Sequence, residues 1–222
     1  MTSTLTPPRR AALRLAPAAL LLLAACATLD TASSADPQDA FWAALSSHCG
    51  KAYAGRMVTA DAADADLAGR PMVMTVRDCS AASIAVPFHV QRADGSWDRS
   101  RTWLVARNAA GGLRLKHDHR HEDGTSDAVT MYGGDTATCG TPRAQSFPVD
   151  ADSIASFTRA GLAASVTNVW TIAVDPAGTA GGTYAYELRR TVAGGAPAER
   201  HFRVEFDLTR PIAPPPPAWG WE

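Results

Sequence analysis

The sequence lacks the short motifs that mark the common catalytic sites. It contains no G-x-S-x-G nucleophile elbow, no H-E-x-x-H zinc motif, no P-loop and no dinucleotide-binding G-x-G-x-x-G. Its serine, histidine and aspartate residues show no spacing that would set them in a nucleophilic array. These absences make an enzyme less expected than a binding or interaction protein.

Lysine is also scarce, since Lys51 and Lys116 are the only lysines in 222 residues. The 21 basic residues are balanced by 22 acidic ones, and three of the basic residues fall within the first 25 positions. No basic stripe or interleaved aromatic platform is found along the rest of the chain. The sequence therefore argues against nucleic-acid binding.

The apolar run from Leu15 to Ala25 is too short for a membrane-spanning helix, which needs about 20 residues. A basic start precedes this run, and small residues follow it, which is the pattern of a secretory signal over residues 1–25. The run ends in "LAAC" (Leu23 to Cys26), which resembles the lipobox of bacterial lipoproteins.

The lipobox resemblance implies that the signal is cut before Cys26 and that this cysteine is acylated. It also implies an outer-membrane location, because Ala27 rather than aspartate follows the cysteine. Several acyl chains give a stable anchor where one would not. Residues 26–36 are small and polar and are expected to form a flexible tether. The expected protein is lipid-anchored in the cell envelope and faces the periplasm. The alternative is an ordinary signal peptide that happens to contain a cysteine.

A single folded domain is expected over residues 37–210, and it begins with a short helix. Asp36 can cap this helix, Pro37 suits its first position, and Gly50 can end it. The side chains expected on its buried face are Phe41, Trp42 and Leu45.

After this helix the apolar period changes to two, which indicates strands. The strand-like segments are 51–60, 71–79, 83–90, 101–108, 112–122, 127–134, 165–174, 183–190 and 200–208. Glycine, proline, asparagine and aspartate clusters separate most of them. One more helix is expected before the last strands, over 150–161, with Asp150 or Asp152 as its cap and Ile154 and Phe157 facing inward.

A short helix that leads into a long antiparallel meander resembles the calycin superfamily, meaning the lipocalins and their bacterial lipoprotein relatives. The expected fold is mainly β, an antiparallel calycin-like barrel of about eight to ten strands with a short N-terminal helix and one helix inserted before the last strands. The first strand departs from the lipocalin pattern, because "CGKAYAG" stands where G-x-W is usual. The run "RTW…LKHDHRHEDG…TMYGG" also resembles uncharacterised bacterial secreted proteins. An immunoglobulin-like sandwich is the alternative fold.

Three cysteines remain after Cys26, and no two of the four cysteines form a C-x-x-C pair. This argues against a zinc ribbon and a thioredoxin-type redox site. The oxidising compartment that the signal implies allows three single disulfides among them. The strand map favours Cys49 with Cys79, because these residues precede the first strand and end the second strand of one hairpin. Cys139 is then expected to stay reduced.

Three of the six histidines, His117, His119 and His121, stand at every second position of one expected strand. Alternate side chains of a strand share a face, so these histidines point the same way as Leu113 and Leu115. Neighbouring imidazoles on that face start about 7 Å apart, which permits one zinc or copper ion between them. Three imidazoles in line can reach one tetrahedral ion only if the strand bends or another residue supplies a ligand. A solvated polar face is the alternative, and catalysis by these histidines is a third.

The turn "EDGT" after the histidines predicts a hairpin that places small or hydroxylic side chains beside them. His89 and Glu122 are the candidate further ligands. On the opposite face of this hairpin, Arg120 and Asp127 are expected to form a cross-strand ion pair.

Two other patterns suggest binding. One strand carries Arg101, Trp103, Val105 and Arg107 on a single face, which could hold an anionic ligand or be an ordinary amphipathic strand. The proline-rich tail, residues 211–222, favours polyproline II and is expected to be unstructured unless it docks on a partner. The alternating residues expected in the barrel core are Trp170, Tyr184, Tyr186, Phe202, Val204 and Phe206.

Three functions follow from these observations. The first is a lipid-anchored barrel that binds a small ligand or a transition-metal ion in the envelope. The second is a structural or interaction lipoprotein without a ligand. The third, and least expected, is a metal-dependent hydrolase that uses the histidine strand, because aligned imidazoles alone do not make a catalytic site.

Overall fold

The structure is a computed structural model, and it describes residues 1, 36–192 and 196–221. The expected signal peptide, Cys26 and most of the tether lie outside the described residues. In the described part, no helix is long and apolar enough to cross a membrane.

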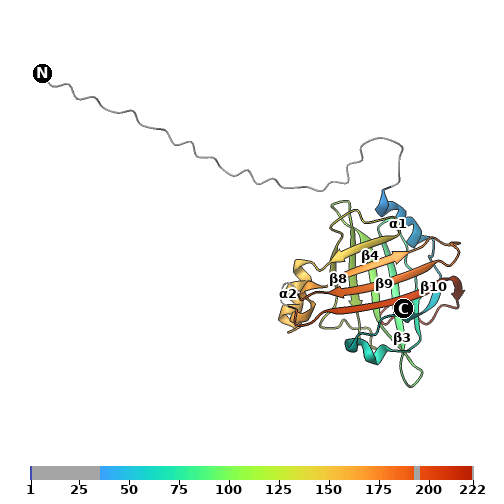
Figure 1. The fold of residues 1–222 in the computed structure, drawn as a ribbon. Helices are drawn as coiled ribbons and strands as arrows, with labels where there is room; N and C mark the ends of the chain where they lie inside the picture. Colours follow the sequence, from blue (N-terminus) through green and yellow to red (C-terminus); the bar gives the residue numbers. More distant parts are fainter. Residues whose placement is uncertain (2–35, 193–195, 222) are drawn as a thin grey trace.

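Ten antiparallel strands form one sheet that curls into a nearly closed barrel (Figure 1). The strands are β1 (Ala52–Met57), β2 (Met72–Thr75), β3 (Ser83–Gln91), β4 (Trp97–Arg107), β5 (Leu113–His119), β6 (Tyr132–Asp135), β7 (Ala144–Pro148), β8 (Val169–Val174), β9 (Thr183–Arg190) and β10 (Arg200–Ile212). Neighbours in the chain are neighbours in the sheet except β6 and β7, which form its two edges, and β1 also pairs with β10. The expected mainly β barrel fold is therefore confirmed, and the sandwich is not formed.

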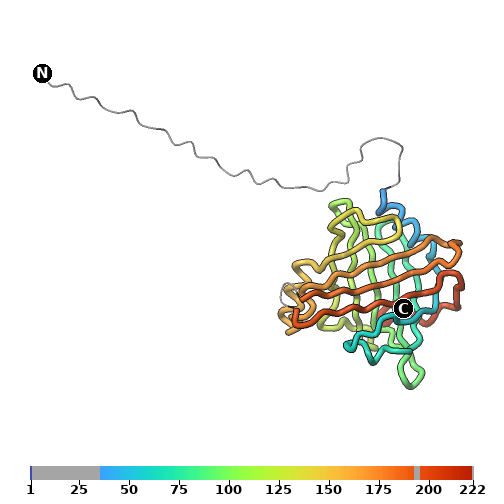
Figure 2. Tube along the Cα trace, in the orientation of Figure 1, coloured from blue at the N-terminus to red at the C-terminus, as the bar shows by residue number. Residues whose placement is uncertain are grey.

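The strands cross in projection, as they do where a twisted sheet closes on itself. Figure 2 shows the green strands running steeply behind the orange and red strands, which run across the view. The helices are α1 (Pro37–Ser46) and α2 (Ala151–Arg159), and two 3₁₀ helices, η1 (Ala62–Leu67) and η2 (Ala163–Thr167), complete the fold.

Helix α1 begins where the sequence predicts it. The Asp36 carboxylate accepts a hydrogen bond from the backbone N–H of Gln38 at 2.8 Å, and Pro37 is the first helical residue. Its buried apolar side chains include the predicted Phe41, Trp42 and Leu45, and Phe41 and Leu45 are fully buried. Helix α1 therefore packs its apolar face on the barrel core.

The β1–β10 pairing closes the barrel, and it depends on a glycine. A Cβ atom at Gly55 would lie 2.4 Å from the carbonyl oxygen of Glu205 and 2.4 Å from the Phe206 ring. No larger residue fits between the two strands at this point. Between Tyr53 and Gly55 the register shifts from Pro211 to Phe206, so the extra residues lie on β10 and bend that strand there.

The remaining gap lies between β6 and β7, and the start of α2 bridges it. The Asp150 N–H donates to the Gly133 carbonyl at 2.9 Å, and the Ser153 hydroxyl bonds both backbone groups of Gly133. Lys116 adds an ion pair to Asp150 at 2.6 Å. A Cβ at Gly134 would lie 1.7 Å from the Pro148 carbonyl oxygen, so this closure also requires glycine.

Several sequence-based expectations need correction. The first strand ends at Met57 and is followed by η1, which was not expected, and β7 was also missed. Ile154 is 36% exposed rather than inward-facing, whereas Phe157 is buried as predicted. Helix α2 is short and only one side of it meets the barrel, so one of the two apolar positions remains near solvent.

The Cys49–Cys79 disulfide is confirmed, with the two Cα atoms 6.2 Å apart. The expectation that Cys139 stays reduced is wrong, because Cys139 is also disulfide-bonded. The strand map placed the first hairpin correctly, but it gave no information on the loop that holds Cys139.

The proline-rich tail is folded against the barrel, which corrects the expectation of an unstructured end. Strand β10 extends to Ile212, and the backbone N–H of Trp219 donates to the Arg99 carbonyl at 3.1 Å. Trp219 is 6% exposed, and the Arg92 guanidinium lies 5.3 Å from its ring centroid. The Trp221 indole donates to the Asp118 carboxylate at 2.9 Å.

Candidate ligand-binding cavity

A cavity of about 350 Å³ lies inside the barrel, and η1, α2 and η2 each contribute a side chain to its lining. Its aromatic lining residues are Phe88, Trp103, Tyr132, Phe157, Trp170, Tyr186 and Phe202. Ligand sites are usually concave and mostly apolar, with a few placed polar groups, and this volume is at the small end of their range. The cavity therefore has the size and lining of a site for a small molecule.

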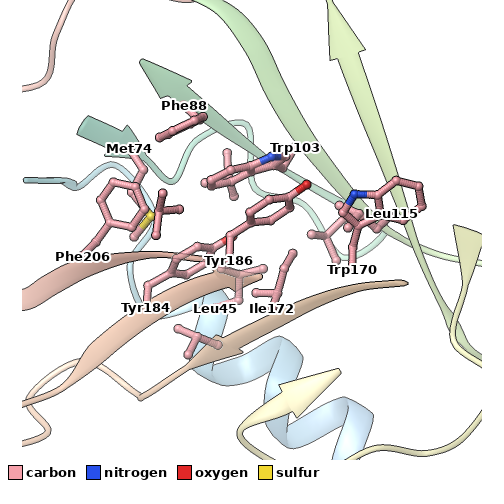
Figure 3. Packing of buried hydrophobic residues seen from close by; sticks show 14 of the residues in the cluster. Leu45, Met74, Phe88, Trp103, Leu115, Trp170, Ile172, Tyr184, Tyr186 and Phe206 are labelled. Atoms are coloured by element: carbon pink, nitrogen blue, oxygen red, sulfur yellow. The ribbon is translucent and has the colours of Figure 1, made fainter. Parts of the chain in front are cut away.

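The aromatic wall is built from facing strands. The Trp103 ring stacks on Tyr186 with ring centroids 4.2 Å apart and on Phe88 with centroids 4.8 Å apart. Figure 3 shows these three rings in successive layers, with Trp170 to one side. Parallel aromatic faces in a packed core change position little, so this wall is a preformed surface.

His117 is fully buried and uses both of its ring nitrogens. Nδ1 lies 3.0 Å from the Tyr132 carbonyl oxygen, and Nε2 lies 2.7 Å from the Tyr186 hydroxyl. A carbonyl can only accept, so Nδ1 donates and Nε2 accepts from Tyr186. Burial lowers the pKa of His117 to about 3, which keeps the ring neutral at ordinary pH.

His119 shares this environment. Its Nε2 lies 3.0 Å from the Tyr132 hydroxyl, and both residues line the cavity. Burial lowers the pKa of His119 to about 4 and raises that of Tyr132 to about 12. The two inward histidines are therefore neutral hydrogen-bonding groups beside the aromatic wall.

His121 does not join them. Strand β5 ends at His119, and His121 is exposed in the turn, where its N–H donates to the Thr125 carbonyl at 2.8 Å. Among residues 36–192 and 196–221, no group of three histidine, cysteine, aspartate or glutamate side chains is placed to hold a metal ion. The shared direction of His117 and His119 agrees with the sequence, but both nitrogens of His117 are already bonded within the protein.

The other candidate ligands are also apart from the cavity histidines. Glu122 is exposed, and His89 is on the opposite face of the sheet, since Phe88 and Val90 beside it point into the core. His89 is 1% exposed, neither ring nitrogen has a hydrogen-bond partner within the described structure, and burial lowers its pKa to about 4.

The predicted Arg120–Asp127 pair is not formed. Arg120 instead pairs with Asp118 at 2.8 Å on the outer face, where Trp221 also bonds the same carboxylate. Asp127 lines the cavity. Arg120 pairs with Ser126 rather than with Asp127, so the register of this hairpin differs by one residue from the expected one.

Three arginines line the cavity with different partners. Arg101 is paired with Asp98 at 2.6 Å, and Arg200 is paired with the buried carboxylate of Asp64. Arg190 forms no ion pair within the described structure. Its guanidinium donates to the Asn168 side-chain oxygen at 3.1 Å and to the Ser165 hydroxyl at 3.4 Å.

The sequence located part of this site. Arg101 and Trp103 share one face of β4 as predicted, and both line the cavity, whereas Arg107 lies near α1, where it stacks over Trp42. Arg190 and Arg200, at the facing ends of β9 and β10, were missed. The sequence did hold a signal for Arg190: it stands two residues after Leu188 on the same strand, so it shares the inward face of Leu188.

Comparison with models of protein families, with curated proteins and with solved structures finds no match for this chain.

Proposed function

We propose that this protein binds a small, largely apolar ligand inside its barrel while a lipid anchor holds it in the cell envelope. The observation that carries the binding proposal is the preformed cavity, with stacked Trp103 and Tyr186 on its wall and the neutral pair His117 and His119 beside them. An apolar ligand is stabilised by leaving water for such a wall, and the His119 imidazole and the tyrosine hydroxyls can fix its orientation.

Titration with N-phenyl-1-naphthylamine, a neutral aromatic probe that fluoresces in apolar surroundings, tests the binding. Val129→Trp should fill part of the cavity and weaken probe binding at least about tenfold, since Val129 lines it. Val192→Trp is the matched control, because Val192 is 53% exposed and outside the lining. No saturable binding to wild type, or equal weakening by both variants, would contradict the proposal.

The anchor proposal is supported by the signal pattern and by "LAAC" at Leu23 to Cys26. Cys26→Ser removes the sulfur to which the lipid would be attached, so the variant should incorporate no labelled palmitate and should leave the membrane fraction. Equal labelling of variant and wild type contradicts the anchor. Peptide mapping gives a second test. Cys49 and Cys79 bond each other, so a lipidated Cys26 requires Cys139 to form its disulfide with a cysteine of another molecule. A Cys26–Cys139 peptide would contradict the anchor, because one sulfur cannot carry both bonds.

A further inference from the structure

Of the three arginines that line the cavity, Arg190 is the one without an ion pair in the described structure. Arg101 and Arg200 each have a carboxylate partner, but Arg190 bonds only the neutral side chains of Asn168 and Ser165. It is also half-buried and lies close enough to Arg200 for the two charges to repel, while the carboxylates of Asp61 and Asp64 attract it from beyond ion-pair distance. A partly buried cation without a directly paired carboxylate is costly, so this arrangement favours an anion that bonds the Arg190 guanidinium itself.

The donors of Arg190 suit an acidic group. A guanidinium carries five N–H donors in a planar fork, and two of those on Arg190 are used by its neutral neighbours. The remaining donors match the two oxygens of a carboxylate, sulfonate or phosphate. Asp127, the one carboxylate in the described lining, comes from the β5–β6 connection and not from the strands that hold Arg190 and Arg200.

The aromatic wall supplies the other half of the recognition. Leu188 precedes Arg190 on the same face of β9, and Tyr186 precedes Leu188, so one strand connects the arginine to the stacked rings. His117 and His119 lie on this wall without charge, so they neither attract nor repel an ion. A ligand with a ring at one end and an acid at the other would match both parts.

We propose that the cavity selects small aromatic anions, with the acidic group bound by Arg190 and the ring packed against the wall of Trp103 and Tyr186. This inference depends on the proposed ligand-binding function and names the class of ligand that the site prefers.

Two probes that share one scaffold test it. N-phenyl-1-naphthylamine is neutral, and 8-anilinonaphthalene-1-sulfonate adds one sulfonate to the same rings. The sulfonate should bind wild type at least about tenfold more tightly than the neutral probe. Arg190→Gln should weaken binding of the sulfonate far more than binding of the neutral probe, and so abolish this preference.

Arg189→Gln is the matched control, because it removes the same charge one residue away. Arg189 points outward, is 61% exposed along its side chain and pairs with Glu187, so the sulfonate preference should persist. Arg190→Lys, which keeps the charge without the fork, should retain only part of the preference.

The outcomes separate the two proposals. If neither probe binds wild type, the ligand-binding function fails. If the neutral probe binds and the sulfonate is no tighter, or if Arg190→Gln keeps the preference, the function stands and the anion inference is overturned. The comparison of the two probes in wild type still tests the preference for an anion if an Arg190 variant does not fold.

Discussion

Buried histidines contribute to how this barrel responds to pH. His117 has a pKa of about 3, and His89 and His119 have pKa values of about 4, in each case mainly because burial disfavours the charged ring. The unfolded chain binds these protons near pH 6.5. Between pH 6.5 and about 4 the unfolded state therefore holds more protons than the folded state, and acid favours unfolding.

We expect the free energy of unfolding to fall as pH drops from 6.5, by up to about 1.4 kcal/mol per pH unit for each buried histidine. Urea unfolding at pH 7.0, 6.0 and 5.0 measures this slope. His89→Leu should reduce the slope and should not lower stability at pH 7, since the ring it removes has no hydrogen-bond partner within the described structure. A slope that is unchanged by the substitution, or stability that is flat over this range, would refute the assignment.

The sequence predicts where the histidine side chains point but not what they bond. The direction of His117 and His119 follows from the period of two, because both lie on the face of the buried Leu113 and Leu115. Their partners do not follow from it. Tyr132 and Tyr186 are 15 and 69 residues from His117, and only the closed barrel brings them to its ring.

At the scale of elements, the C-terminal tail changes most between sequence and structure. Prolines predict an extended chain, but the two tryptophans that fix it, Trp219 and Trp221, bind surface features of β4 and β5 that no local pattern reveals. Helix α1 is the opposite case, since Asp36, Pro37 and the apolar spacing specify it locally. Strand β7 was missed because its five residues hold a proline and only two buried side chains.

We expect Trp219→Ala to lower the melting temperature by roughly 4–8 °C, because it exposes the tail's buried anchor at a cost of about 2 kcal/mol. Ile212→Ala is the control, and it should change stability little, since Ile212 is already 38% exposed. Thermal unfolding followed by circular dichroism measures both. Equal melting temperatures for Trp219→Ala and wild type would mean that the tail does not contribute to the fold.

At the scale of the whole molecule, closure of the barrel creates the cavity. The meander itself could be predicted, because alternating apolar residues and turn clusters recur along the chain. The two closures could not, since they require glycines at close approaches between distant segments, Gly55 against β10 and Gly134 against Pro148. Arg190 and Arg200 reach the cavity lining only in this closed form, which is why the sequence indicated one wall of the site and not the other.

The central claim is that the interior cavity, and not the surface, binds a small aromatic ligand. The indole N–H signals of the tryptophans test it in one NMR titration with N-phenyl-1-naphthylamine. Trp103 and Trp170 line the cavity, whereas Trp219 and Trp221 fix the tail outside the barrel. We predict saturable shifts of the Trp103 and Trp170 signals and no shift of the tail signals. Shifts confined to Trp219 and Trp221, or no shift at any indole, would contradict the account.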